Sequence, residues 1–168
     1  VGWDWTAINL DDGGAFMAFR IRDADGASVW AGGSYRSPPS ARAGAGLGGL
    51  DSDSPRFAPS PLAGEGRGGE AGQGRGAETR IFRRDEISFT PLRAWRSPRT
   101  STEYPVVMRV RAGDLDFTLK PLFDDQEFDA RASTGTIYWE GAVRATQNGK
   151  SVGRGYLELT GYWRKLTM

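Results

Sequence analysis

Apolar and polar residues alternate along most of the chain, which is the pattern of a β-strand that buries one of its two faces. Glycine, asparagine and aspartate separate the alternating stretches and mark turns, as in Asp11-Asp12-Gly13-Gly14 and Asn148-Gly149. The expected strands cover residues 3–10, 15–22, 27–31, 79–83, 86–95, 104–111, 115–122, 136–146 and 152–163. No stretch predicts an amphipathic helix of useful length. The pattern therefore favours a closed antiparallel barrel of about eight strands, with a β-sandwich as the alternative.

Residues 38–78 interrupt this alternation. They hold eleven of the 24 glycines and five of the nine prolines of the chain. Such a segment cannot bury enough apolar surface to offset the entropy of ordering it, so we expect a long disordered insertion of low complexity. A lid over the barrel mouth is the functional alternative, but Leu47, Leu50, Phe57 and Leu62 offer few apolar anchors for one. Deleting residues 39–77 is expected to leave the melting temperature and ligand binding nearly unchanged.

Composition narrows the classes of function. Lysine and arginine total 22 against 21 acidic residues, so the net charge of +1 gives no reason to expect nucleic acid or an anionic membrane as a partner. No apolar run reaches the length of a membrane span. Cysteine and histidine are absent, which excludes a thiol nucleophile and, within this chain, a Ser-His-Asp hydrolase. Neither a cofactor nor a metal is expected. The six Trp, five Tyr and eight Phe can supply apolar walls for a small ligand.

The last hairpin decides where its two glutamates point. If Asn148-Gly149 forms a two-residue turn, Glu140 lies opposite Leu157, and one glutamate faces the core whichever face is buried. If the loop holds an odd number of residues, Trp139 shares a face with the leucines of the last strand. Glu140 and Glu158 then share the other face with Arg144 and Arg154, as a solvated face of cross-strand pairs or a surface against a first barrel. We favour the second arrangement because it separates apolar from polar side chains far better.

Several motifs, found in the same order, resemble the second barrel of the carotenoid 1,2-hydratase and AttH-type family of predicted secreted hydrolases. Together they cover nearly everything outside the insertion. The matching stretches are Gly2-Trp3-Asp4-Trp5, Leu10-Asp11-Asp12-Gly13, Arg93-Ala94-Trp95-Arg96-Ser97-Pro98, Tyr104-Pro105-Val106, Asp124-Asp125-Gln126-Glu127, Thr136-Ile137-Tyr138-Trp139-Glu140-Gly141-Ala142-Val143 and Gly153-Arg154-Gly155-Tyr156-Leu157-Glu158-Leu159-Thr160-Gly161-Tyr162.

The resemblance implies a protein of two lipocalin-like barrels in the periplasm or secreted, some of whose relatives hydrate a carbon–carbon double bond of a carotenoid. Residues 1–168 are then a single all-β, antiparallel, lipocalin-like barrel domain, and the first lipocalin-like domain of the parent protein is its expected partner. The chain opens with Val1 and lacks the Trp-Gly motif that the family carries just upstream of its tryptophan pair. We therefore expect a fragment, and the family's histidine and acid partners correspond to no position here.

Hydration of an unactivated alkene needs an acid that stays neutral beside an apolar wall, because desolvation raises the pKa of a carboxyl group. Asp4, Glu140 and Glu158 are the acids that lie among aromatic residues. Asp4 is a weak catalytic candidate, and its structural alternative is a bond to the backbone or to an arginine. The acidic run 124–127 lacks the spacing of a calcium loop and is interpreted as a solvated turn.

The leading hypothesis for function is binding of an apolar small molecule. Its alternatives are part of an envelope hydratase or hydrolase that acts on an apolar substrate, and a structural barrel that braces the missing first domain. The predicted ligand-binding residues are Trp3, Trp5, Phe19, Tyr138 and Trp139.

Overall fold

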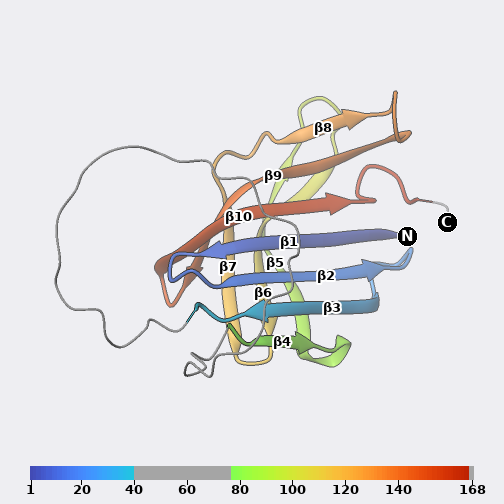
Figure 1. Cartoon of the computed structure of the whole chain (residues 1–168). Helices are drawn as coiled ribbons and strands as arrows, with labels where there is room; N and C mark the ends of the chain where they lie inside the picture. Colours follow the sequence, from blue (N-terminus) through green and yellow to red (C-terminus); the bar gives the residue numbers. More distant parts are fainter. Residues whose placement is uncertain (40–76, 167–168) are drawn as a thin grey trace, which may run out of the picture.

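The computed structural model describes residues 1–39 and 77–166, which form one antiparallel sheet (Figure 1). The order across the sheet is β4-β3-β2-β1-β10-β9-β7-β6-β5, and β8 pairs with β9. The predicted all-β, antiparallel fold is confirmed, with ten strands where about eight were expected. The elements are β1 (Gly2–Leu10), β2 (Ala15–Arg22), β3 (Ser28–Arg36), β4 (Thr79–Phe82), the 3-10 turn η1 (Arg84–Glu86), β5 (Ile87–Arg96), β6 (Glu103–Ala112), β7 (Leu115–Pro121), β8 (Glu127–Ala130), β9 (Thr136–Gln147) and β10 (Lys150–Thr160).

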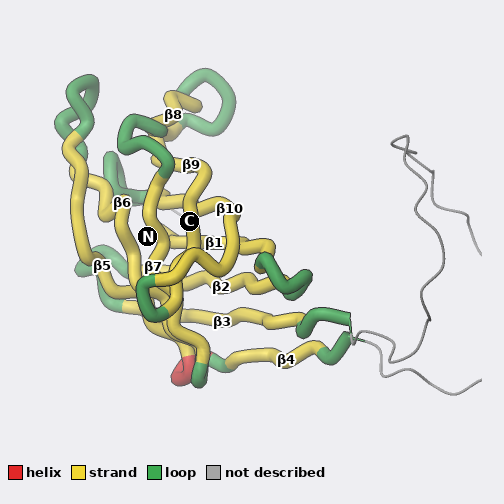
Figure 2. Tube along the Cα trace, turned by 90° about the vertical axis from the view of Figure 1, so that its left-hand side faces the viewer, coloured by secondary structure: helices red, strands yellow, loops and turns green. Residues whose placement is uncertain are grey.

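The sheet bends over on itself along β9. The first half of β9 pairs with β8 and its second half pairs with β7. As a result β5, β6 and β7 cross behind β1 to β4, and the side view shows the two layers facing one another (Figures 1 and 2). Large apolar side chains from both layers fill the space between them, as in an orthogonal sheet packing. The buried core includes Phe16, Leu157 and Leu159 from one layer and Val106, Met108 and Leu119 from the other.

The predicted closure into a barrel needs correction, because no backbone ladder joins β4 to β5 among the described residues. Side chains bridge the gap: Arg20 Nη1 on β2 donates to the carbonyl oxygen of Phe89 on β5 at 3.0 Å. Two features of the end strands keep the sheet open. β4 has only four residues, and β5 contains Pro91, which lacks an amide proton, beside two register shifts.

Residues 40–76 lie outside the described part of the chain, so the expectations of disorder or of a lid over residues 38–78 concern residues that are not described. The ends of this segment do meet. Ser37 N donates to the carbonyl oxygen of Glu78 at 2.9 Å, directly beyond the paired ends of β3 and β4. The insertion therefore connects two neighbouring antiparallel strands. The tolerated deletion of residues 39–77 stays a prediction.

The final hairpin sorts its side chains as favoured from the sequence, but by a different device. The turn has two residues, Asn148 and Gly149, and both have positive φ angles, as a type I′ turn requires. The register then shifts between Ser151 and Gly153, which leaves Val152 as a bulge. Because of this extra residue, Trp139 faces Leu159 and Glu140 faces Glu158.

Two strands differ from the prediction for local reasons. β8 was not expected from the sequence, and only its first residue, Glu127, belongs to the acidic run 124–127 that was interpreted as a solvated turn. The polarity of β8 is inverted, since the Glu127 side chain is 2% exposed and Phe128 is 52% exposed. β10 ends at Thr160, since Gly161 adopts a positive φ of 79° that a strand does not use. Within the described ranges, no helix is long and apolar enough to cross a membrane.

Candidate functional site

A hollow of about 430 Å³ lies on the outer face of β1, β2 and β10, the face that points away from the core. Strand alternation creates it: Asp4, Thr6 and Ile8 of β1 point inward and are buried, while Trp3 and Trp5 point outward and stay partly exposed. We call this site the aromatic hollow. It is lined by Trp3, Trp5, Phe19, Ile21 and Glu158.

Cross-strand neighbours form the wall of the aromatic hollow. Trp5 on β1 lies directly opposite Phe19 on β2. Phe19 in turn stacks on Trp30 of β3, with ring centroids 4.3 Å apart and planes inclined by 29°. Gly32 makes room for this stack, because a Cβ there would lie 2.8 Å from the Trp30 ring. The result is a broad, partly exposed apolar surface across three strands.

One glutamate, Glu158, lines the aromatic hollow, and a second, Glu140, lies beside it; we call these two residues the acid pair. Glu158 and Glu140 lie directly opposite each other on β10 and β9. Glu158 Oε1 accepts hydrogen bonds from Trp3 Nε1 at 2.8 Å and from Thr160 Oγ1 at 3.1 Å. Within residues 1–39 and 77–166 neither carboxylate has an ion-pair partner. Burial and the charge of Glu158 raise the pKa of Glu140 above its ordinary value.

A row of three basic residues lies on the same face, further along the strands. Arg144 on β9 stands opposite Arg154 on β10 and opposite Lys120 on β7. All three side chains are exposed, and none has an ion-pair partner in the described part of the chain. The two arginines also line a hollow of about 210 Å³ with Asn9 and Ala142. We call these three residues the basic row. The arrangement of the last hairpin that the sequence favours already places Arg144 and Arg154 on one face, and Lys120 joins them only through the pairing of β7 with β9.

Asp4 lies on the opposite face of β1 and is fully buried. Its carboxylate accepts from Arg20 Nε at 2.5 Å and from the Tyr162 hydroxyl at 2.9 Å, and Arg22 Nε lies 3.2 Å away. Burial, followed by the charge of Asp4, raises the pKa of Tyr162, which keeps this phenol a donor. The structural alternative for Asp4, a bond to an arginine, is what the structure shows, and the residue has no access to the aromatic hollow.

The predicted ligand-binding residues divide between the two faces. Trp3, Trp5 and Phe19 line the aromatic hollow, and Tyr138 lies on the same outer face beside the acid pair. Trp139 is fully buried in the core, and its Nε1 donates to the carbonyl oxygen of Asp124 at 2.7 Å. The alternation of β9 could have shown this from sequence, because adjacent strand residues point to opposite faces.

The acidic run 124–127 is engaged by arginines and hydroxyls. Asp124 makes a bidentate pair with Arg93, with both bonds at 2.7 Å, which holds the pKa of this carboxyl below its usual value. Glu127 accepts from Ser97 Oγ at 2.8 Å and from Thr100 Oγ1 at 2.6 Å. These bonds fasten the 97–102 loop to β8. In the described ranges, no group of three or more acidic residues is arranged to hold a metal ion.

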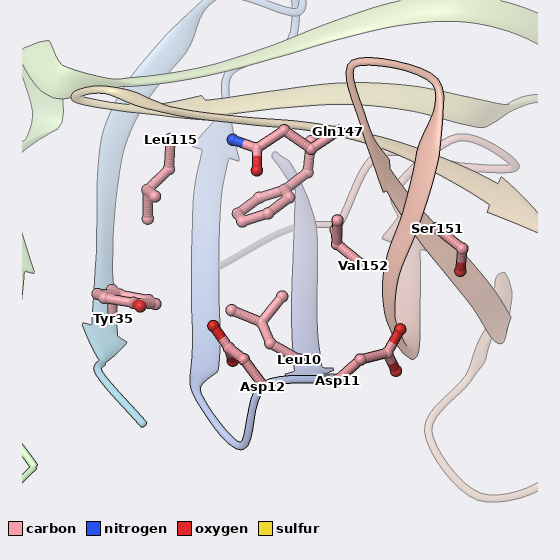
Figure 3. A pocket seen from close by; sticks show the side chains of 9 residues that line it. Leu10, Asp11, Asp12, Tyr35, Leu115, Gln147, Ser151 and Val152 are labelled. Carbon is pink, nitrogen blue, oxygen red and sulfur yellow. The ribbon is translucent and has the colours of Figure 1, made fainter. Parts of the chain in front are cut away.

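A second hollow of about 290 Å³ opens at one end of the space between the layers (Figure 3). Leu10 and Val152 turn toward it, and Asp11 and Asp12 of the β1–β2 turn stand at its rim. Asp12 also accepts a bond from the amide of Gly14 at 2.8 Å. This end hollow combines a small apolar floor with an acidic rim. The aromatic hollow is larger and has more extensive aromatic walls.

The bent antiparallel sheet with a filled interior and an aromatic outer face defines a lipocalin-like β-domain. The sequence model of the AttH-like family matches residues 67–162. The chain belongs to the AttH-like family, which confirms the resemblance seen in the sequence motifs. No curated protein matches the chain.

Two solved structures share the fold. An AttH-type protein from Nitrosomonas europaea is 42% identical over 96% of this chain, with a TM-score of 0.70. Kievitone hydratase from Nectria haematococca is 17% identical over 96% of this chain, with a TM-score of 0.57, and shows the fold alone. The chain spans 38% and 40% of these two proteins. Most of each relative thus has no counterpart here.

Proposed function

We propose that this domain binds an apolar small molecule in the aromatic hollow on its outer face. The observation that carries the proposal is a hollow of about 430 Å³ whose walls are two tryptophans, a phenylalanine and an isoleucine. Ligand sites of this kind are mostly apolar with a few placed polar groups, and Glu158 supplies such a group. The interior between the layers is filled by side chains, so the outer face offers the larger apolar wall.

Tryptophan fluorescence tests this proposal directly. Hexadecanol should shield Trp3 and Trp5 from water and shift their emission to shorter wavelength, with a stoichiometry near one ligand per chain. Replacing one wall, in Trp5→Ala, should weaken binding about tenfold, because an aromatic contact and its buried area are lost. Trp163→Phe is the matched control, since Trp163 follows β10 and does not line the hollow. Equal affinity for hexadecanol in wild type and Trp5→Ala, taken from the midpoint of the titration, would contradict the proposal.

A second candidate function is bracing of a further domain by the same face. It is favoured by the length of the two solved relatives, since the chain covers 38% and 40% of them. Trp30 is 47% exposed and Phe128 is 52% exposed, so the outer face retains apolar surface that a neighbouring domain could cover. A bracing domain would bind the separately expressed remainder of the longer protein and would show no saturable emission shift with hexadecanol.

Catalysis, hydration or hydrolysis of an apolar substrate, is a property that we assign to the longer parent protein. The acid on this domain best placed for it is Glu140, which lies opposite the lining residue Glu158 and whose pKa is raised by burial and by Glu158. Asp4 faces the core with two arginine partners. Activity of the parent protein should therefore fall in Glu140→Gln, while the folded fraction of that variant stays unchanged.

A further inference from the structure

Charges on the outer face are sorted by sign along the strands. The acid pair, Glu140 and Glu158, lies level with Trp5 at the aromatic hollow. Four residues further along β9 and β10, Arg144 and Arg154 lie level with Asn9, and Lys120 extends the row onto β7. At about 3.3 Å per residue, the acid pair and the basic row are separated by about 13 Å.

Folding alone does not account for this arrangement. Like charges that face each other across two strands destabilise a sheet, whereas opposite charges stabilise it. Elsewhere on the described surface the chain follows that rule. Arg109 pairs with Asp116 across β6 and β7, and Arg93 and Arg99 each pair with an aspartate of the 124–127 run. A basic row without acidic partners is therefore available for an anion from outside the domain.

The path between the basic row and the aromatic hollow is apolar. Ala7 of β1 lies between Asn9 and Trp5, with Met17 beside it on β2 and Tyr156 beside it on β10. The Ala7 side chain is small, so it leaves space between the side chains of Tyr156 and Met17 on either side. An extended hydrocarbon chain could lie along β1 from the arginines to the tryptophans.

From this geometry we infer that the ligand is a long-chain carboxylate, with its head group at Arg144 and Arg154 and its hydrocarbon chain in the aromatic hollow. This inference rests on the proposed function and adds the class of ligand. A guanidinium group matches a carboxylate with two parallel hydrogen bonds, and Lys120 adds a third positive charge. The acid pair at the far end repels an anionic head and fixes the direction of binding.

A bilayer is a poorer occupant of this face. The hollow is bounded and has the volume for part of one hydrocarbon chain, and an anionic lipid surface would meet the acid pair as well as the basic row. We therefore commit to a single free fatty acid.

Palmitate and hexadecanol, which share a hydrocarbon chain length, form the test pair. The whole chain should bind palmitate roughly tenfold or more tightly than hexadecanol at low salt, and added salt should reduce this preference. The double variant Arg144→Gln/Arg154→Gln should bind both probes with the affinity of hexadecanol. It should also unfold no more easily than wild type, because it relieves repulsion. The matched control Arg36→Gln/Lys150→Gln removes two exposed charges outside the basic row and should keep the preference.

The outcomes separate the two proposals. Equal binding of both probes by wild type, or unchanged palmitate affinity in the double variant, overturns the carboxylate and leaves apolar binding intact. Failure of both probes to bind overturns the proposed function as well. Co-sedimentation with phosphatidylglycerol vesicles that the double variant loses, without any effect on palmitate, assigns the basic row to a membrane and also overturns the inference.

Discussion

The two faces of β1 and its neighbours differ in how their charged side chains are paired. On the inner face, Asp4 is fully buried and is matched by Arg20, Arg22 and the Tyr162 hydroxyl. On the outer face, Glu140 faces Glu158 and Arg144 faces Arg154. Burial makes an unmatched charge very costly, so the inner face pairs its ions. The half-exposed outer face tolerates repulsion, which leaves its charges free for another molecule.

The largest effect on the free energy of unfolding is expected from a substitution that breaks the ion pairs of the inner face. Asp4→Asn removes a buried negative charge from beside the buried Arg22 and the partly buried Arg20, and it should lower the free energy of unfolding by about 3–5 kcal/mol. Asp129→Asn, which breaks the exposed pair with Arg131, should change it far less, because water screens that pair. Urea unfolding of both variants measures the contrast. Equal losses would show that the buried network does not stabilise the fold in the way that we describe.

A smaller difference is expected between apolar residues of the two faces of β10. Leu159→Ala empties a fully buried position and should cost about 2–5 kcal/mol. Tyr156→Thr, on the outer face where Tyr156 is 40% exposed, should stay within about 0.5 kcal/mol because threonine keeps a strand preference. Thermal unfolding checks both. A large loss in Tyr156→Thr would mean that the outer face is itself packed.

Glu140→Gln probes the acid pair and should raise the free energy of unfolding by about 0.2–1 kcal/mol at neutral pH, because it removes a repulsion across the strands. Burial and the charge of Glu158 raise the pKa of Glu140 above the ordinary value of a glutamate, so the folded state holds the proton more tightly than the unfolded state does. In the wild type, Glu140 therefore contributes to stability at low pH, where it is protonated. This contribution is lost as pH rises from the ordinary glutamate pKa to the raised one.

The pH dependence gives the control for this variant. Unfolding curves of wild type and Glu140→Gln, compared from about pH 4 to pH 7, should diverge in favour of the variant as pH rises. Aspartates paired with arginine, such as Asp124 and Asp125, have lowered pKa values, so both proteins lose stability in acid. This contribution cancels when the free energy of unfolding of wild type is subtracted from that of the variant at each pH. A constant difference across this range would argue against repulsion within the acid pair.

The smallest effect is expected in the basic row, whose side chains are exposed. Arg154→Glu places an acid opposite Arg144 and should raise the free energy of unfolding by about 0.2–0.5 kcal/mol. The same change should remove the preference for palmitate over hexadecanol. A gain in stability together with a loss of binding would show that this row sacrifices stability for recognition. A loss in stability would contradict that view.

Much of the fold could be predicted from the sequence, and the exceptions are instructive. The strands β1 and β2 follow clean alternation and were placed within one residue of their observed bounds. β8 was missed because Phe128 points outward and Glu127 points inward, where hydroxyls of the 97–102 loop satisfy its charge. That reversal depends on partners about thirty residues earlier in the chain, which local pattern does not contain.

The candidate site shows the same division. Trp3 and Trp5 share a face by the alternation of β1, and Phe19 shares one with Met17 and Ile21 by the alternation of β2. Trp139 was grouped with Tyr138 although adjacent strand residues face opposite sides, and the structure buries it. Arg144 and Arg154 were placed on one face from the last hairpin, whereas Lys120 joins the basic row only through the pairing of β7 with β9.

The sequence by itself determined that the chain forms β-strands, where most turns lie and which residues share a face within each strand. These properties depend on the local geometry of an extended backbone. The tertiary structure alone decided which strands lie side by side, how the Val152 bulge sets their register, and that the sheet bends without closing. Register and pairing depend on contacts between distant segments, and for this reason the like-charge rows appear only in the folded molecule.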